Sequence, residues 1–147
     1  SPHCDQIGGS YIAGEIGVDA DKCNIDYGKT IDLNSGGGSL AVAIRIADRI
    51  ALNETGVFVS EYCGSACTVF LASADHRSMC HYSFIGVHQG GNDETTEKYL
   101  EYMKQDPRID YEAIAETVAD TGFLNVALFN SYKAKKLGLI DQVIECD

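Results

Sequence analysis

The sequence predicts a single α/β domain over residues 1–147, built on a mainly parallel sheet with crossover helices. Two observations predict it. Short apolar segments alternate with helical ones in a ββα/βαβ order, which is typical of parallel sheets. Hydrophobic residues make up 45% of the chain and charged residues 22%, as in ordinary globular domains. Disordered, collagen-like and coiled-coil classes are therefore excluded.

The first half of the chain alternates between strand and helix signals. Residues 10–16 (SYIAGEI) are expected to form a strand and the polar residues 17–28 a loop. Residues 30–34 (TIDLN) alternate as a second strand. The glycines of 35–38 predict a turn, because glycine weakens strand and helix interiors. From 39 to 53 apolar side chains recur at helical spacing, which predicts an amphipathic helix.

The second half continues this pattern. Residues 57–60 form a brief apolar strand, and Gly64 separates it from a helix of small and apolar residues at 65–74. A strand is predicted over 82–88, ending in His88. The remaining expected elements are helices at 93–105, 110–121 and 130–137 and a strand at 141–144.

The charge of the chain limits its partners. It has 22 acidic and 11 basic residues, so its formal net charge is −11. Nucleic acids and anionic membranes favour the opposite sign, so neither is expected as a partner. No apolar run approaches the roughly 20 residues of a membrane span. No cofactor is expected, and no metal is expected unless the cysteines bind one, which is the least favoured of their three interpretations below.

The chain contains six cysteines, and three interpretations of them stay open: disulfides, reduced structural thiols or a metal site. They are Cys4, Cys23, Cys63, Cys67, Cys80 and Cys146. There is no CxxC spacing for zinc, and an even number favours three disulfides, for which 15 full pairings exist. Disulfides lead us to expect an exported, extracytoplasmic protein, and because the chain starts at Ser1, any export signal is expected to have been removed.

Three segments carry chemistry where strands pass into the following elements, the place where ligands gather on parallel sheets. In Asn34 to Ser39, glycine amides before a helix can hold a phosphate or an oxyanion; the alternative is a plain tight turn. In Tyr62 to Thr68, Ser65 is a candidate nucleophile with the Ala66 amide as oxyanion donor. The alternatives are that Ser65 caps a helix or that a cysteine is the nucleophile.

The third segment is Gly86 to Gly91. Its His88 stands at a predicted strand end before two glycines, where it could act as a general base. The alternative is a structural histidine. The three segments together are more specific than any one of them. If none of them were functional, all three structural alternatives would have to hold at neighbouring strand ends.

These motifs resemble the proteolytic subunit of the Clp protease. The resemblance rests on IDLNSGGGS, GSAC, IGVHQGG and the closing AKKLGLID, and it covers about 30–144. The Cys-Gly-Ser-Ala-Cys-Thr variant is most similar to the exported, periplasmic Clp-like branch. The resemblance implies the ClpP/crotonase fold, a spiral of stacked ββα units.

The resemblance also implies roles for individual residues. Ser65 would be the acyl-forming nucleophile and His88 its general base, and the amides of Gly38 and Ala66 would form the oxyanion hole. Asn34 and Gly37 would belong to the wall of the peptide-binding groove. The substrate would be a peptide or protein.

Three departures from the family pattern bear on activity and assembly. Gly36 replaces the family's proline, which should loosen that turn. No carboxylate occupies the place of the family's acid, so Asn125 or Asp120 could orient His88 instead. The segment between His88 and the C-terminal helix is shorter than in the family, so we expect any homo-oligomer to be smaller than the Clp barrel.

Three functions follow from the sequence. The leading one is an exported serine hydrolase, a peptidase, using the Ser65–His88 pair. The second is a catalytically silent Clp-like module that binds peptide or assembles with partners. The third, which the acidic charge disfavours, is crotonase-type acyl-CoA chemistry.

Cys63, Cys67 and Cys80 lie close in sequence to the proposed nucleophile and the histidine strand. A regular helix holds residues four apart too far for a disulfide. Either the chain bends at Gly64 and joins Cys63 to Cys67, or one of them pairs with Cys80. At least one of the three is predicted to be bridged, as a clamp on the site.

Overall fold

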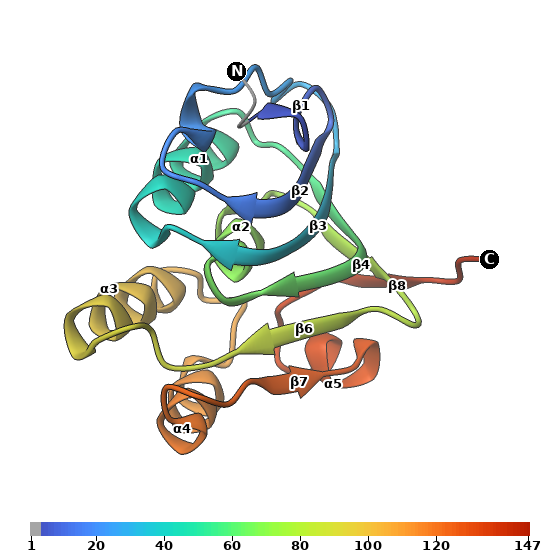
Figure 1. Cartoon of the computed structure of the whole chain (residues 1–147). Helices are drawn as coiled ribbons and strands as arrows, with labels where there is room; N and C mark the ends of the chain where they lie inside the picture. Colours follow the sequence, from blue (N-terminus) through green and yellow to red (C-terminus); the bar gives the residue numbers. More distant parts are fainter. Residues whose placement is uncertain (1–3) are drawn as a thin grey trace.

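The computed structural model describes residues 4–147, which form one mixed sheet with helices packed against it (Figure 1). The strands are β1 (Ile7–Gly8), β2 (Tyr11–Ile16), β3 (Ile31–Gly38), β4 (Val57–Gly64), β5 (Arg77–Cys80), β6 (Phe84–Val87), β7 (Ala127–Phe129) and β8 (Gln142–Ile144). Their order is β1-β2-β3-β4-β5-β8, and β6 lies between β4 and β7. Only the β1–β2 and β6–β7 pairs of this sheet are antiparallel, which confirms the mainly parallel sheet.

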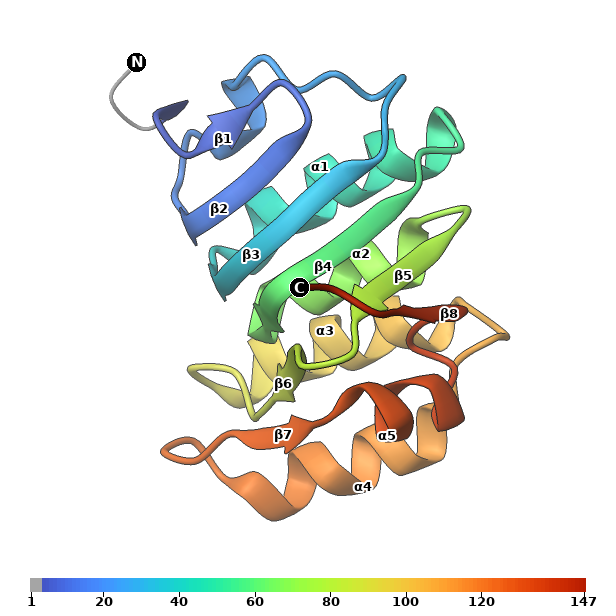
Figure 2. The same cartoon turned by 90° about the vertical axis from the view of Figure 1, so that its right-hand side faces the viewer.

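The helices α1, α2 and α3 lie behind one face of the sheet, and α4 and α5 lie beside β6 and β7 (Figure 2). Their bounds are α1 (Leu40–Leu52), α2 (Thr68–Ser73), α3 (Asp93–Lys104), α4 (Tyr111–Thr121) and α5 (Ser131–Lys136), with short 3-10 turns η2 (Ala20–Lys22) and η3 (Ser65–Cys67). Helix α1 shows why the sequence folds this way. Its buried side chains recur at helical spacing, and the Ser39 hydroxyl caps its first turn by accepting the Val42 N–H at 3.3 Å.

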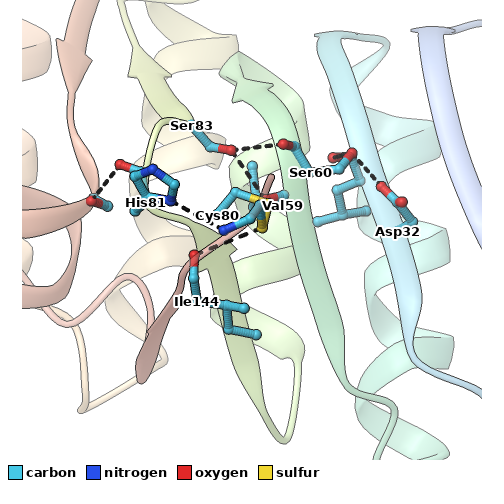
Figure 3. Close-up of a disulfide and its surroundings, with 10 residues drawn as sticks. Asp32, Val59, Ser60, Cys80, His81, Ser83 and Ile144 are labelled. Atoms are coloured by element: carbon cyan, nitrogen blue, oxygen red, sulfur yellow. Dashed lines mark hydrogen bonds between the residues drawn. A yellow bond between two sulfur atoms is a disulfide. The ribbon is translucent and has the colours of Figure 1, made fainter.

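Strand β4 forks the sheet into two branches. Its first residues, Val57 to Val59, pair with β5, whereas Tyr62 to Gly64 pair with β6. Between the branches the Ser83 hydroxyl lies 2.8 Å from the Ser60 carbonyl oxygen and 3.3 Å from that of Val59 (Figure 3). The hydroxyl therefore supplies a donor where the strand ladder is interrupted. The fork directs β6 to the edge of the sheet where β3 and β4 also end.

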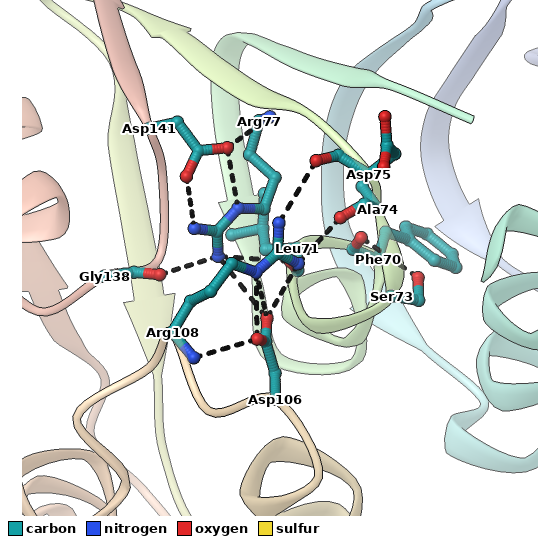
Figure 4. A network of polar contacts seen from close by, with 10 residues as sticks. All are labelled: Phe70, Leu71, Ser73, Ala74, Asp75, Arg77, Asp106, Arg108, Gly138 and Asp141. Atoms are coloured by element: carbon teal, nitrogen blue, oxygen red, sulfur yellow. Dashed lines mark hydrogen bonds and ion pairs between the residues drawn. The ribbon is translucent and has the colours of Figure 1, made fainter. Parts of the chain in front are cut away.

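A buried ionic network around Arg77 joins four segments of the chain (Figure 4). The Arg77 side chain is 1% exposed, and its guanidinium donates to the Asp141 carboxylate at 2.6 and 3.2 Å. It also lies 3.6 Å from Asp106, which accepts from Arg108 at 2.9 Å. Arg108 in turn donates to the Ala74 carbonyl at 2.7 Å. The network thus joins β5, the end of α2, the loop after α3 and the segment before β8.

Several sequence predictions of local structure are wrong. Residues 35–38 are not a turn but the last part of β3, because Gly37 and Gly38 take positive φ values (102° and 150°) within the strand. The predicted helix at 65–74 begins as the 3-10 turn η3. Strands β1, β5 and β7 were not predicted. All three are short, and β5 (RSMC) carries an arginine whose partners lie far along the chain.

Candidate active site

A pocket of about 160 Å³ lies where β3, β4 and β6 end. It brings together the three segments that the sequence singled out, since Gly38, Ser65 and His88 all border it. The full set of lining residues is Gly38, Leu40, Ser65, Ala66, His88, Gly90, Gly91, Thr95 and Tyr99. None of them is a lysine, an arginine, an aspartate or a glutamate.

Ser65 occupies a strained turn between β4 and the helical segment that follows. Its φ is +53°, in the left-handed region that non-glycine residues seldom adopt. The residue at the cap position is Gly64, and no side chain caps η3. The interpretation of Ser65 as a helix cap is therefore wrong. The turn instead presents Ser65 at the pocket.

A disulfide closes the Ser65 turn. Cys63, at the end of β4, is bonded to Cys67, with Cα atoms 5.3 Å apart, and both residues are 0% exposed. The chain stays extended at Gly64 and turns at Ser65, so the bend that this pairing requires lies one residue later than the sequence predicted. The disulfide makes residues 63–67 a small closed ring with Ser65 at its centre. It also removes both cysteines as nucleophiles.

The glycines of β3 allow that strand to lie directly against the turn. A methyl group added at Gly37 would come within 2.8 Å of the Gly64 carbonyl oxygen and 2.9 Å of Ser65 Cβ. At Gly38 it would meet the Ile16 carbonyl oxygen at 2.3 Å. Both contacts are closer than carbon atoms tolerate, so glycine is required at both positions. The Gly37 N–H donates to the Ser35 hydroxyl at 3.1 Å, which fixes this part of the strand.

Behind the turn, Thr68 holds the Ser65 carbonyl through both its backbone N–H and its hydroxyl, and the Tyr99 hydroxyl contacts that of Thr68. Thr68 Oγ1 donates to the Ser65 carbonyl oxygen at 2.7 Å, and it lies 2.5 Å from the Tyr99 hydroxyl. Burial raises the pKa of Tyr99 to about 12. The sequence did not identify Thr68 or Tyr99, because they belong to different helices and lie 31 residues apart. Spacing alone could have placed Tyr99 on the same face of α3 as Thr95.

His88 follows β6, and one of its ring nitrogens is engaged by the backbone. Its Nδ1 contacts the Gln89 carbonyl oxygen. A carbonyl can only accept, so Nδ1 carries the hydrogen of this contact, and in the neutral imidazole the lone pair is then on Nε2. Gln89 is itself attached to α4, since its N–H donates to Thr121 Oγ1 at 3.3 Å and its side chain donates to the Ala119 carbonyl at 3.2 Å.

The two candidates for a third catalytic member lie away from the pocket. Asn125 Nδ2 donates to the Thr121 carbonyl oxygen at 3.3 Å, and both Asn125 and Asp120 are exposed. Within residues 4–147, neither is hydrogen-bonded to His88, and Ser65 Oγ makes no hydrogen bond to His88 either. Asn34 also lies outside the pocket, where its Nδ2 donates to Glu61 Oε2 at 3.2 Å.

All six cysteines are paired. Besides Cys63–Cys67, the disulfides are Cys4–Cys23 and Cys80–Cys146. The prediction that Cys63, Cys67 and Cys80 include a bridged residue is confirmed, whereas the alternative pairing of Cys80 with one of the other two is wrong. Three disulfides indicate an oxidising compartment. In the part of the chain that the structure describes, no helix is long and apolar enough to cross a membrane.

No protein-family model and no curated protein matches the sequence, but solved structures match the fold. The ClpP1 N165D mutant from Listeria monocytogenes superimposes with a TM-score of 0.72 at 18% identity, covering 97% of this chain and 93% of that one. The chain has a ClpP-like fold. The catalytic domain of the ClpP protease from Plasmodium falciparum matches with a TM-score of 0.67 at 24% identity, covering 93% of this chain and 84% of that one.

The ClpP-like fold confirms the predicted α/β class. Parallel strands of such a sheet end at the same edge, and the pocket lies at that edge. Ser65 and His88 reach the pocket from two different strands, β4 and β6.

Proposed function

We propose that this protein is an exported serine hydrolase, a peptidase, in which Ser65 is the nucleophile and His88 the general base. The observation that carries the proposal is the left-handed backbone of Ser65 at a pocket that it shares with His88. Such a conformation costs roughly 1–2 kcal/mol, and strained residues cluster at functional sites.

The chemistry follows from the groups around the pocket. Ser65 Oγ attacks the carbonyl carbon of the scissile bond, and its proton passes to His88 Nε2. The negative charge that develops on the carbonyl oxygen lies between the N–H groups of Gly38 and Ala66. The tetrahedral intermediate collapses when the leaving amine takes the proton from His88. Water then attacks the acyl-enzyme, again with His88 as base, and frees Ser65.

The Gln89 carbonyl takes the part that an acid has in a Ser-His-Asp triad. It accepts the Nδ1 hydrogen and so selects the tautomer in which Nε2 is basic. A neutral carbonyl stabilises the imidazolium less than a carboxylate does. We therefore expect slow turnover, with Asn125 and Asp120 contributing little to it.

The proposal is tested with a fluorophosphonate probe and a set of fluorogenic peptides with uncharged residues at the cleavage site. The wild-type chain should form one adduct and cleave at least one peptide, and Ser65→Ala should do neither. Ser73→Ala is the matched control, because Ser73 lies in α2 with its hydroxyl bonded to the Phe70 carbonyl at 3.1 Å. A wild-type chain that neither labels nor turns over would overturn the proposal.

A second candidate function is a silent ClpP-like module that binds peptide without cleaving it. It is favoured by one observation, the lack of a hydrogen bond from Ser65 or any carboxylate to His88 within residues 4–147. This candidate predicts that a peptide binds equally well to the wild type and to Ser65→Ala, while no product forms. Binding measured by fluorescence anisotropy alongside the labelling experiment separates the two functions.

The proposed compartment and assembly follow from the same features. An oxidising compartment fits the three disulfides, and we propose the periplasm. We also propose that peptides or proteins are the substrates and that any homo-oligomer is smaller than the Clp barrel, which sedimentation of the oxidised protein would test.

A further inference from the structure

We infer that Thr68 and Tyr99 are positioning residues that aim and polarise the Ala66 N–H of the oxyanion hole. The inference rests on the proposed hydrolase function and extends it to Thr68 behind the pocket and to Tyr99 on its wall. It concerns one peptide unit, the bond between Ser65 and Ala66. The carbonyl of this unit accepts from the Thr68 hydroxyl and from the Thr68 backbone N–H, and its N–H belongs to Ala66 at the pocket.

The direction of each hydrogen bond in this chain of groups is fixed by counting donors. The Ser65 carbonyl oxygen can only accept, so the single hydroxyl hydrogen of Thr68 is used in that 2.7 Å bond. The Tyr99 hydroxyl, 2.5 Å from Thr68 Oγ1, must then be the donor to Thr68. The chain therefore runs from Tyr99 through Thr68 to Ser65, with every hydrogen directed toward the carbonyl.

The geometry of the peptide bond links the orientation of the Ser65 carbonyl to that of the Ala66 N–H. A trans peptide unit is planar, with its C=O and N–H pointing in opposite directions, and the described chain has no cis bond. Holding the Ser65 carbonyl thus sets where the Ala66 N–H points. Bonds accepted by the carbonyl also polarise the unit, which makes its N–H a better donor to an oxyanion.

Both hydroxyl groups are buried, which keeps the donor-to-acceptor order from Tyr99 through Thr68 to Ser65 fixed. Thr68 is 0% exposed and Tyr99 is 6% exposed. With its pKa raised to about 12 by burial, Tyr99 stays a donor at any pH at which a hydrolase would work. Tyr99 reaches Thr68 from α3, so it couples the packing of that helix to the Ser65 turn.

The test compares the rate at which the fluorophosphonate probe labels Ser65 in Thr68→Val, Thr68→Ser and Tyr99→Phe. Thr68→Val keeps the shape but removes the hydroxyl, and labelling should slow about tenfold or more, since losing a whole oxyanion donor costs roughly 10²–10³-fold. Thr68→Ser keeps the hydroxyl and should label within about threefold of wild type. Thr55→Val is the matched control, because Thr55 is equally buried and bonds a carbonyl far from the site at 2.6 Å.

The double variant separates positioning from stability. Thr68→Val leaves the Tyr99 hydroxyl buried without its acceptor, which destabilises the fold. Adding Tyr99→Phe removes that group, so the melting temperature should recover while labelling stays slow. Recovery of both together would overturn the inference, as would wild-type labelling in Thr68→Val. A wild-type chain that never labels would instead overturn the proposed function, and this inference with it.

Discussion

The three disulfides differ in what they should do, and the difference can be worked out from their positions. Cys63–Cys67 spans 4 residues and Cys80–Cys146 spans 66. In the chain-entropy model, the small loop stabilises the fold by about 2 kcal/mol and the large one by about 4 kcal/mol. Replacing both cysteines of a pair with alanine should therefore lower the melting temperature about half as much for the small loop as for the large one.

The effect on the labelling of Ser65 should instead be larger when the small loop is opened than when the large one is. The Cys63–Cys67 ring holds Ser65 at φ +53°, a conformation that costs about 1–2 kcal/mol relative to the right-handed region. Without the ring, the reactive conformation would be populated roughly 5–30-fold less, and labelling by the fluorophosphonate should slow by that factor. Cys80–Cys146 ties β5 to the C-terminal segment and does not border the pocket, so its removal should leave labelling unchanged at temperatures where the variant is folded.

The assay is the labelling rate of each double-alanine variant beside its thermal unfolding curve, both without reductant. The reasoning is refuted if the Cys63→Ala/Cys67→Ala variant labels as fast as wild type. It is equally refuted if the Cys80→Ala/Cys146→Ala variant, folded at the assay temperature, loses labelling to the same extent.

Three further predictions follow from the packing and the charges. Gly37→Ala should abolish labelling, because the added carbon would lie 2.9 Å from Ser65 Cβ at a residue with φ +102°. The intact-mass shift with the probe measures labelling, and a normal shift would contradict this prediction. Arg77→Met should destabilise the fold by about 3–5 kcal/mol, since it leaves the buried Asp106 without one of its two arginine partners; urea unfolding measures it, and a change below about 1 kcal/mol would contradict it. The hydrogen bonds from Arg77 lower the pKa of Asp141 below its usual 3.8, so its contribution to stability is fully present above that unfolded value and is lost as the pH falls through the lower folded one. Unfolding followed from pH 6 to pH 2 should show a smaller loss in Asp141→Asn than in wild type, and equal losses would contradict the assignment.

Much of the site could be predicted from the sequence because its members stand at strand ends. Glycines before a helix, a serine after a strand and a histidine after another strand are local signals. A parallel sheet brings such ends to one edge. That is why the pocket contains Gly38, Ser65 and His88, as expected.

The parts that were missed depend on contacts between distant residues. Nothing near Thr68 in the sequence indicates that Tyr99 will reach it from another helix. The partner of His88 is a backbone carbonyl, and since every residue has one, no residue type could indicate it. A carboxylate or an amide side chain was expected there, with Asp120 and Asn125 as candidates, but Asp120 is exposed and Asn125 is bonded to Thr121.

Local rules also failed where tertiary structure overrides them. A run of glycines favours a turn, but at 36–38 it forms a strand, because the positive φ of Gly37 and Gly38 and their lack of side chains let β3 lie against the Ser65 turn. Strand β5 was missed for a similar reason. Arginine is usually a surface residue, and Arg77 can be buried only because Asp141 and Asp106 pair with it.

The most direct test of the proposed hydrolase is to map the site of a fluorophosphonate adduct on the oxidised wild-type protein by peptide mass spectrometry. The account predicts a single adduct on Ser65, formed far more slowly in His88→Ala and at an unchanged rate in Asn125→Ala. An unmodified Ser65 after long exposure, or an adduct on another residue, would contradict it.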